Sequence, residues 1–576
     1  MSRTLWIYGF ALAIRCITSW TYAHWFHPDE WCQTLEHANL IAHGFGFHSQ
    51  ETGLHLRNLS WPALLALLLK VVHAVSPQGI GLRIWSVHFL CGLLDLGILW
   101  GWMQLAPGLI KAPRRDPLLP SIKLWSLALL LLPWYTLYSS INPRAEHLSE
   151  IAFWIALGCF ANQFWILTGI ASVAIFAFRY PSILLSIGIG SSILLQAVQG
   201  KSFSRIYRFC LGIVFGLILF GISDWLFYGR PWESFWMYLQ YNIFTGSGTQ
   251  AFGEQGISSY SEIFLWNWTT YRLLAPLGIL LFFAGVYGFW KGLQQAQNWA
   301  ICLALYLIAH LLVPHKEARF MAPIETLTRW SAFTGCLALY FSLTSCLDSL
   351  QLRRFKKAAV TILWFFIIIN GFIFLHHLRG DLWKDLGTYR ELSTHLKHHP
   401  NTCGILTTRF VNSLLLPFQD SLSFPQPAVA SFQSNLNHLT YEATKDSDLF
   451  WIEHPPNCRP QDSILLHVHE AQTQWNQEGC QLLRSGALQF VPTSFWNLAI
   501  QHRLAKGSWY ACPPTIVHHF RSQKTQHQYS HQFGKQKELP AYGISATELE
   551  KIGRQTSPPP VDAVLPSIIP SAHLRD

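Results

Sequence analysis

Long apolar segments recur along this 576-residue chain from its start to residue 376. A helix needs about 20 mostly apolar residues to cross the hydrocarbon core of a bilayer. Segments that approach or exceed this length are 5–25, 61–76, 82–105, 122–139, 148–168, 168–198, 209–228, 274–291, 298–313, 331–346 and 358–376, of which 168–198 has room for two short helices. The pattern predicts a polytopic α-helical membrane protein with roughly 10–12 transmembrane helices.

The scarcity of charged residues supports the same fold class. They make up 12% of the chain, about half of the share that a soluble domain usually carries. So few charges cannot cover the surface of a soluble protein of this size, which excludes a cytosolic enzyme, a disordered protein and a typical nucleic-acid-binding protein. The formal net charge of +10 therefore indicates basic loops beside a membrane.

The chain changes character after residue 376, because no later apolar run is long enough to cross a membrane. We expect a transmembrane domain over residues 1–378 and an extracytoplasmic soluble region over 379–515. Short β-like runs such as Ile464–Val468 and Ala487–Val491 predict a mixed α/β structure for that region. Residues 516–576 are polar, rich in His and Gln and then in Pro, a composition that predicts a disordered tail.

Clusters of Lys and Arg predict the orientation, because these residues favour cytoplasmic loops. The clusters lie at 111–115, 201–208 and 353–357. They place on the non-cytoplasmic face the loops 26–60, 140–150, 229–273 and 314–330. One conflict remains. Loop 26–60 is expected on the non-cytoplasmic face and loop 106–121 on the cytoplasmic face, so an odd number of helices should cross the membrane between them. Two apolar segments, 61–76 and 82–105, lie there. Either 61–76 is re-entrant or the cluster at 111–115 is an exception.

The first of these loops carries His27-Pro28-Asp29-Glu30-Trp31 directly after an apolar segment. Adjacent carboxylates at a membrane boundary are energetically costly unless they are paired or used. One of them could accept a proton from a sugar hydroxyl as a general base. Alternatively, Asp29 and Glu30 occupy the first turn of a helix that begins near Trp31, where acids favour the positive end of the helix dipole. The residues alone leave both interpretations open.

A second polar group, His315-Lys316-Glu317-Ala318-Arg319-Phe320, follows the apolar segment that ends near Val313. Lys316 and Arg319 stand three residues apart, so a helix would place them on one face. Lys binds phosphate as a point charge and Arg as a bidentate donor, so the pair suits a lipid phosphate at the membrane surface. The alternative is an interfacial anchor in which both side chains snorkel to the headgroups.

Other polar residues give weaker signals. Glu51, His55 and Arg57 lie in the first loop and, taken alone, are surface polar residues. Arg144 and Glu146 belong to the segment 142–147, in which four of six side chains are polar. The group His467, His469 and Glu470 has the composition of a metal site, but alternate residues of a strand face the same way for ordinary reasons. We therefore assign no metal site.

Together these motifs resemble those of the multi-pass mannosyltransferases of GPI-anchor and asparagine-linked glycan assembly, which depend on lipid-phosphomannose and have the GT-C architecture. The family's His-Pro-Asp-Glu motif, followed by an aromatic residue and Gln, matches His27 to Glu30, then Trp31 and Gln33. Its His-Lys-Glu-x-Arg-Phe motif matches His315 to Phe320. A third family succession is similar to Asp224, Phe227-Tyr228-Gly229, Phe235, Asn242 and Phe252-Gly253. The resemblance covers residues 5–375.

The first loop departs from the family pattern. The family's Thr-Trp-Glu-Trp is replaced by Ser49-Gln50-Glu51-Thr52, so Glu51 is kept and both flanking Trp are lost, while Arg57 is kept. Arg144 and Glu146 match the family's Arg-x-x-Ser-Asn-x-x-Glu segment only loosely. Because Trp faces often stack on sugars, their loss indicates a different acceptor.

The resemblance implies a GT-C-like fold in which residues 1–378 form the catalytic domain. It implies transfer of a hexose, mannose in this family, from a polyprenyl-phosphate donor to a lipid-linked glycan acceptor, with inversion at the anomeric carbon. The catalytic residues would be Asp29, as the general base, and Glu30. The donor phosphate would be bound by His315, Lys316 and Arg319. The substrate-binding candidates are Glu51, Arg57, Arg144 and Glu146.

The resemblance assigns no cofactor and leaves a divalent cation open. The expected partners are the polyprenyl-phosphate sugar donor, the lipid-linked glycan acceptor and membrane lipids, with no nucleic acid. The expected location is the bacterial inner membrane or the ER membrane, with the active site on the non-cytoplasmic face. An alternative function is a carrier or flippase for lipid-linked sugars, whose usual signs are internal repeats and charged or broken helices near mid-membrane. Here no repeat is seen and the charges lie at one face.

Overall fold

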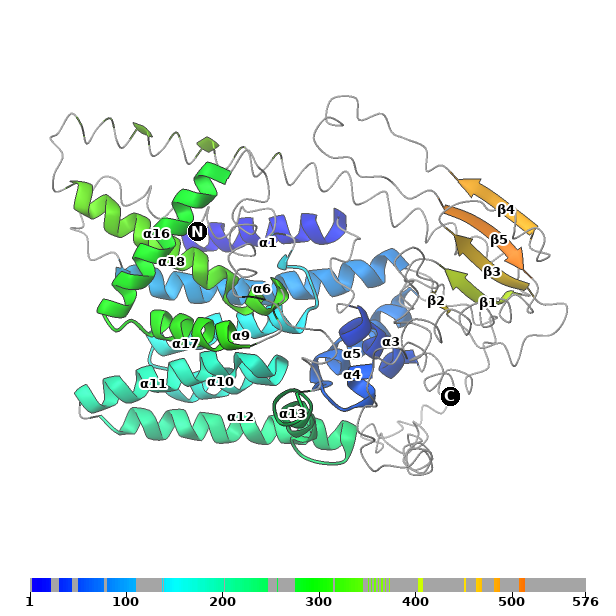
Figure 1. Cartoon of the computed structure of the whole chain (residues 1–576), viewed down its shortest axis with the longest axis horizontal. Helices are drawn as coiled ribbons and strands as arrows, with labels where there is room; N and C mark the ends of the chain where they lie inside the picture. Colours follow the sequence, from blue (N-terminus) through cyan, green and yellow to red (C-terminus); the bar gives the residue numbers. More distant parts are fainter. Residues whose placement is uncertain are drawn as a thin grey trace, which may run out of the picture. The chain divides into compact units, whose positions relative to one another are not determined.

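Figure 1 shows the computed structural model of the chain. The structure describes residues 3–21, 31–43, 50–76, 80–109, 137, 139–200, 202–246, 256, 275–313, 316, 318–344, isolated positions between 351 and 372, and the five strands given below. The chain divides into two units, Met1–Cys512 and Pro513–Asp576. The second unit lies outside the described residues.

Helices occupy most of the apolar segments expected from the sequence. They are α1 (Arg3–Thr21), η1 (Trp31–Leu35), α3 (Glu36–His43), α4 (Gln50–Gly53), α5 (Ser60–Val75), α6 (Ile80–Leu109), α9 (Ala145–Ala161), α10 (Trp165–Phe178), η2 (Tyr180–Ser182), α11 (Ile183–Gln199), α12 (Ser204–Tyr228), α13 (Glu233–Leu239), η3 (Gln240–Phe244), α16 (Ala275–Gln294), α17 (Asn298–Leu312), η5 (Ala318–Ile324) and α18 (Glu325–Thr344). The expected segments 122–139 and 358–376 lie almost wholly outside the described residues.

The chain from α9 to α11 breaks at two places. After α9 ends, Gln163 takes a left-handed backbone conformation with a φ of 62°, which reverses the chain before α10 begins at Trp165. The second break is η2, where Pro181 has no backbone N–H to continue a helix. The expected division of 168–198 into two short helices is therefore confirmed. The boundary expected at residue 168 is wrong, because a left-handed Gln has no strong sequence signal.

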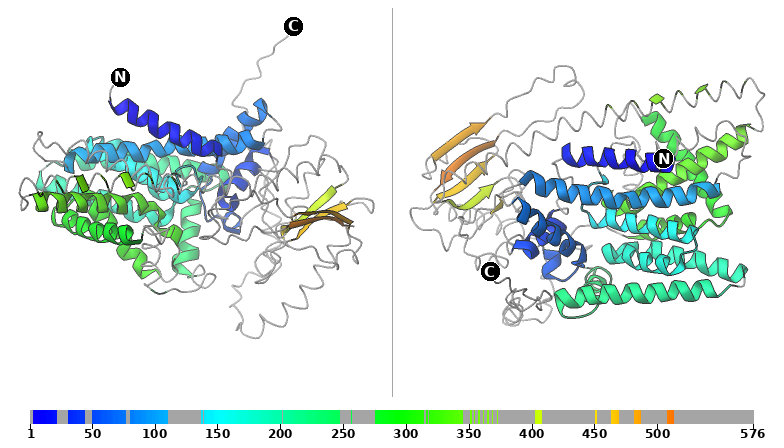
Figure 2. Two further views of the ribbon diagram at one scale, coloured as in Figure 1. Left: turned by 90° about the horizontal axis from the view of Figure 1, so that it is seen from above. Right: turned by 180° about the vertical axis from the view of Figure 1, so that it is seen from behind.

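α1 and α6 run antiparallel. Arg15 of α1 pairs with Asp95 of α6, and Trp20, later in α1, lies beside Trp85, earlier in α6, with ring centroids 6.2 Å apart. α1 therefore ends, and α6 begins, at the same end of this helix pair. Figures 1 and 2 show α3, α4 and α5 gathered beside one end of α6. This geometry supports the first alternative for α5, a re-entrant segment that makes no net crossing.

Three described helices are long and apolar enough to cross a membrane, namely Leu82–Ala106, Tyr180–Gln199 and Ser204–Tyr228. A fourth candidate joins α16 and α17, which are bent by 115° at the break between them. These helices agree with a polytopic membrane protein. The roughly 10–12 spans expected from segment lengths stay a prediction.

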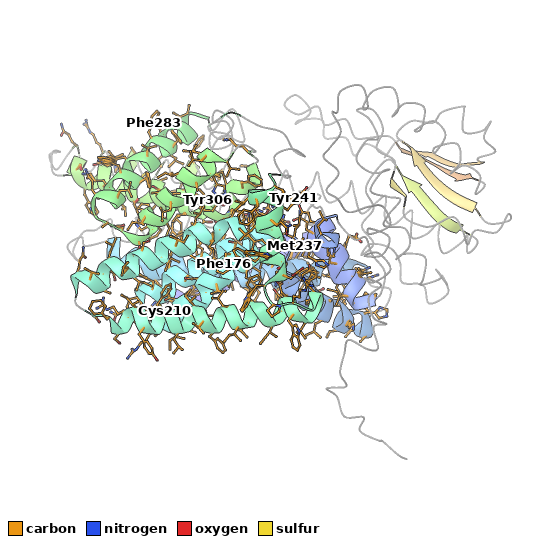
Figure 3. The ribbon with its side chains drawn as sticks, turned by 60° about the horizontal axis from the view of Figure 1, so that its bottom comes forward. Phe176, Cys210, Met237, Tyr241, Phe283 and Tyr306 are labelled. Carbon is orange, nitrogen blue, oxygen red and sulfur yellow. The ribbon has the colours of Figure 1, made fainter. Side chains whose placement is uncertain are left out.

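α10 and α12 pack in parallel with their backbones in close approach. A Cβ atom on Gly169 of α10 would lie 2.3 Å from the carbonyl oxygen of Phe209, and one on Gly212 of α12 would lie 2.1 Å from that of Ile166. Small residues permit such approach between membrane helices. The two helices therefore end at the same end of the bundle. Figure 3 shows Phe176 of α10 and Met237 of α13 at that end, and Cys210 of α12 toward the other.

An aromatic core joins α6, α9 and α18. The rings of Trp102, Trp154 and Trp330 are fully buried. The Trp102 centroid lies 4.7 Å from that of Trp330 and 5.5 Å from that of Trp154, and each such pair contributes about 0.5–1.5 kcal/mol beyond area burial. This core holds the middle of α9 against the start of α18.

Five strands in the C-terminal region form one mixed sheet in the order β2-β1-β3-β5-β4. They are β1 (Thr402–Thr407), β2 (Phe450–Trp451), β3 (Ser463–Val468), β4 (Gln481–Gly486) and β5 (Gly507–Cys512). β1 and β3 are parallel, and the other neighbours are antiparallel. β3 covers the expected run Ile464–Val468, whereas Ala487–Val491 lies outside the described residues. The helices expected in a mixed α/β region stay a prediction.

Candidate active site

Glu146, in the first turn of α9, is the centre of a group of charged side chains. It exposes 2% of its surface and forms an ion pair with Arg179, the residue that follows α10. The charges of Arg57 and Arg144 also act on its carboxylate. Because α9 and α10 are antiparallel neighbours, the reversal at Gln163 is what brings the end of α10 back to the start of α9. We call this group the Glu146 cluster; its members are Glu51, Arg57, Arg144, Glu146 and Arg179.

Arg57 joins the first loop to this cluster. Its Nε lies 2.6 Å from Oε2 of Glu51, and its side chain exposes only 15% of its surface. Burial alone would lower the pKa of Arg57, but the carboxylates of Glu51 and, secondarily, Glu146 raise it above its ordinary value. The guanidinium therefore stays charged at any working pH. The first loop thus brings a permanent positive charge beside a buried carboxylate.

The end of α12 holds the segment that carries Arg57. Tyr228 Oη donates a hydrogen bond to the carbonyl oxygen of Arg57 at 2.6 Å. The amide of Asn58 donates to Oδ1 of Asp224 at 2.7 Å. His55 stacks on Tyr228 with ring centroids 4.4 Å apart and has a φ of 57°, an uncommon conformation for a residue other than glycine. These contacts fix Arg57 relative to α12.

Asp224 also fixes the start of α13 and the turn η2. Its Oδ2 accepts hydrogen bonds from the backbone N of Ser234 at 2.9 Å and from the Ser234 hydroxyl at 2.5 Å. The Ser234 hydroxyl in turn accepts from Tyr180 Oη at 2.5 Å. Tyr180 directly follows Arg179, so this buried carboxylate positions the Arg179 backbone as well as the first loop.

The segment around η5 reaches the same cluster through Phe320. The guanidinium carbon of Arg179 lies 5.1 Å from the centroid of the Phe320 ring, a cation–π distance. Tyr306 of α17, labelled in Figure 3, donates from Oη to the carbonyl oxygen of Phe320 at 2.6 Å. Lys316 is buried, and its Nζ donates to the carbonyl oxygen of Val313 at 2.6 Å. Arg179 therefore contacts both Glu146 and the last residue of the His315–Phe320 motif.

The structure brings together the four substrate-binding candidates Glu51, Arg57, Arg144 and Glu146. It also places Phe320 beside them. The backbone of Arg319 lies in η5, while its side chain lies outside the described residues. Asp29, Glu30 and His315 also lie outside the described residues, so their roles stay predictions.

Sequence reasoning missed Arg179 and gave no role to Asp224. A signal was present for both, because charged side chains in or beside apolar helices are rare and mark functional sites by default. Arg179 ends the apolar run of α10, and Asp224 interrupts that of α12. Their partners could not be predicted, since Arg179 meets Glu146, and Asp224 meets Asn58, only after distant segments pack.

The Glu146 cluster offers donors and acceptors suited to a polar ligand. Glu51 exposes 28% of its side chain and is accessible to a hydroxyl donor, while the arginines supply several N–H groups in fixed directions. Within the residues that the structure describes, no three His, Cys, Asp or Glu side chains converge to hold a metal ion. The carboxylates of this cluster face guanidinium groups instead.

A family model described as the Alg9-like mannosyltransferase family matches residues 6–410. The GPI mannosyltransferase 3 of Drosophila melanogaster is 24% identical over 350 residues, which is 57% of this chain and 57% of that protein. The GPI alpha-1,2-mannosyltransferase 3 of Bos taurus is 22% identical over 442 residues, covering 74% of this chain and 73% of that protein. The chain thus spans just over half the length of the fly relative. The family model and these relatives confirm the resemblance predicted from the motifs.

A solved structure has a similar fold. The crystal structure of ArnT from Cupriavidus metallidurans bound to undecaprenyl phosphate superposes with a TM-score of 0.50 at 10% sequence identity. The superposition covers 88% of this chain and 98% of that one. At this identity the likeness concerns the fold alone, and it supports the GT-C-like helical architecture predicted from the sequence.

Proposed function

Because this chain belongs to the Alg9-like mannosyltransferase family and is a membrane glycosyltransferase, we propose that it transfers mannose from a polyprenyl-phosphate donor to a lipid-linked glycan. The reaction inverts the anomeric carbon. The bond formed is α-1,2, as the name of the bovine relative states for that protein. The loss of both Trp beside Glu51 suggests an acceptor that differs from those of the family.

The arrangement around Arg179 carries this proposal. Arg179 contacts Glu146 on one side and Phe320 on the other, and Arg57 adds its charge to Glu146. Residues from three loops expected on one membrane face thereby meet at a single place. A donor and an acceptor that are both tethered to lipid need one site of this kind at the membrane surface.

The donor is proposed from the motif chemistry and from the fold neighbour. ArnT, which has a similar fold, was crystallised with undecaprenyl phosphate. Lys316 and Arg319 suit the phosphate of such a lipid, because Lys supplies a point charge and Arg a bidentate donor. As the lipid phosphate leaves, these cations stabilise the negative charge that develops on it.

In the proposed reaction, an acceptor hydroxyl oxygen attacks the anomeric carbon while the bond from that carbon to the phosphate oxygen breaks. Asp29 accepts the hydroxyl proton, with Glu30 beside it, and the phosphate stays on the polyprenol. Glu51, Arg57, Arg144 and Glu146 orient the sugars. No cofactor is assigned. The site faces the non-cytoplasmic side of a bacterial inner membrane or an ER membrane.

Two variants test this assignment in membranes supplied with a radiolabelled mannosyl polyprenyl phosphate. Asp29→Asn should accumulate normally and transfer no label, because the general base is lost. Arg319→Ala should mainly raise the donor concentration needed for half-maximal rate. Wild-type transfer by Asp29→Asn would sink the base assignment, and an unchanged donor dependence of Arg319→Ala would remove the phosphate role.

A further inference from the structure

A row of charges of alternating sign crosses the bundle beside the Glu146 cluster. Nε of Arg15 in α1 donates to Oδ2 of Asp95 in α6 at 2.7 Å. Nε2 of His147 in α9 lies 3.1 Å from Oδ1 of Asp95, and Nδ1 of His147 lies 3.6 Å from Oε2 of Glu150. Oε1 of Glu150 accepts from the backbone N of Thr326 in α18 at 2.7 Å. We call Arg15, Asp95, His147 and Glu150 the charged row.

The charged row is deeply buried, and a gain in fold stability does not explain why charges lie there. Its side chains expose 2–4% of their surfaces. Removing charges from water carries a large penalty, and replacement of a buried ionic group by apolar residues is often neutral or stabilising. Such a row is therefore weak evidence for stability. What distinguishes the row is that each carboxylate oxygen of Asp95 and Glu150 faces a different partner, and each ring nitrogen of His147 faces one of these carboxylates.

The row joins the segments that carry the proposed site. At one end it fixes α1, which ends six positions after Arg15 at Thr21 and leads toward Asp29. In the middle it fixes His147, the residue next to Glu146. At the other end it fixes the second residue of α18, which directly follows η5 and its Arg319 backbone.

We propose that Asp95, His147 and Glu150 are positioning residues for sugar transfer, an inference that rests on the function proposed above. The row has two arms that meet at His147. The Arg15–Asp95 arm sets the end of α1, which precedes Asp29 by eight residues in the sequence. The Glu150–Thr326 arm sets η5 and hence the donor phosphate residues. One ring nitrogen of His147 lies beside Asp95 and the other beside Glu150, so His147 stands between the two arms and couples them.

The two arms predict different kinetic defects. Asp95→Asn keeps the shape of the side chain but releases α1, so kcat should fall about 10- to 100-fold while the donor KM stays within about threefold. Glu150→Gln weakens the acceptor for the Thr326 N–H, so the donor KM should rise about tenfold with a smaller change in kcat. His147→Gln, which uncouples the arms, should show both defects.

The experiment measures kcat and donor KM of purified full-length protein with a mannosyl polyprenyl phosphate, each rate being divided by the amount of folded protein. The matched control is Arg205→Gln, a charge removed from the opposite end of α10 and α12, where its guanidinium lies 5.6 Å from the Trp165 ring. This control should leave both parameters unchanged. If Asp95→Asn does not accumulate, Arg15→Gln/Asp95→Asn replaces it, because that double variant leaves no guanidinium without its partner.

The proposal is overturned if the row variants lower only the folded fraction and leave kcat and KM per folded molecule at wild-type values. It is also overturned if Asp95→Asn and Glu150→Gln change the same kinetic parameter. Amide hydrogen exchange separates this failure from failure of the function itself. Even in a protein that transfers no mannose, Asp95→Asn should speed exchange in the last turn of α1, and Glu150→Gln in η5, each without the other.

Discussion

Replacement of Glu146 by Gln should destabilise the fold through the arginines that it leaves behind. Glu146 exposes 2% and Arg179 4% of their side chains, so little solvent screens the pair. Breaking such a buried pair by removing one partner costs about 3–5 kcal/mol. The Gln oxygen still accepts one hydrogen bond, and Arg57 keeps Glu51 at 2.6 Å, so we expect a loss near the lower end, about 3 kcal/mol.

A second variant tests the cause of this loss. Arg179→Met alone leaves Glu146 with the charges of Arg57 and Arg144, so its effect should be smaller, about 1–3 kcal/mol. In the double variant Glu146→Gln/Arg179→Met no guanidinium of the pair is left unpaired, and much of the stability should return. The coupling energy should exceed the cost of Arg179→Met alone and reach about 3 kcal/mol.

The free energy of unfolding is measured in mixed micelles for the wild type, the two single variants and the double variant. Mannose transfer by the same four proteins is measured at a saturating donor concentration. We expect stability to recover in the double variant while transfer stays impaired, since the polar groups around the sugars are still missing. Additive losses, within about 0.5 kcal/mol, would refute the buried-pair reasoning. A neutral Glu146→Gln would refute it equally.

Three further changes test other parts of the structure. Tyr228→Phe removes the hydrogen bond to the Arg57 carbonyl, so it should destabilise the fold by about 1 kcal/mol and raise the acceptor KM. If the free energy of unfolding and the acceptor KM both stay at wild-type values, α12 does not anchor the first loop. Gly212→Leu should prevent α10 and α12 from packing, because any Cβ there meets the Ile166 carbonyl at 2.1 Å, whereas Gly9→Ala has open space and should behave as wild type in thermal unfolding. Burial lowers the pKa of His43 from 6.5 to about 4, and the charges of His73, Arg83 and Lys70 add to this effect. Between these pH values the unfolded chain binds a proton at His43 that the folded chain does not, so the free energy of unfolding should fall as the pH drops from 6.5 to about 4. His43→Gln should make the free energy of unfolding, measured across this range, depend less on pH.

The sequence predicted the class of fold because apolar run length and the scarcity of charge are properties of single segments. It predicted that Glu51, Arg57, Arg144 and Glu146 belong to one site, because loop orientation and the motifs placed them on one face. It did not predict that Arg57 pairs with Glu51, or that Glu146 is held by Arg179. Those pairs depend on the reversal at Gln163 and on the anchoring of the first loop by α12.

The pairings within the charged row could not be predicted from the sequence either. Arg15 was visible as an interruption of the first apolar segment, and Asp95 interrupts another. Neither residue alone indicates which residue it pairs with. Only the antiparallel packing of α1 and α6, together with the start of α9, shows that these charges face one another through His147. Likewise, whether segment 61–76 crosses the membrane depends on the direction of α6 relative to α1, which the sequence of α5 does not specify.

The most direct test of the account is mannose transfer by the purified protein in vesicles that contain a labelled mannosyl polyprenyl phosphate and lipid-linked glycans extracted from cells lacking this protein. We expect the label to move to a glycan one hexose longer through an α-linked bond, and free polyprenyl phosphate to accumulate in equal amount. Movement of the donor across the bilayer with no change in glycan length would contradict it and support a carrier instead.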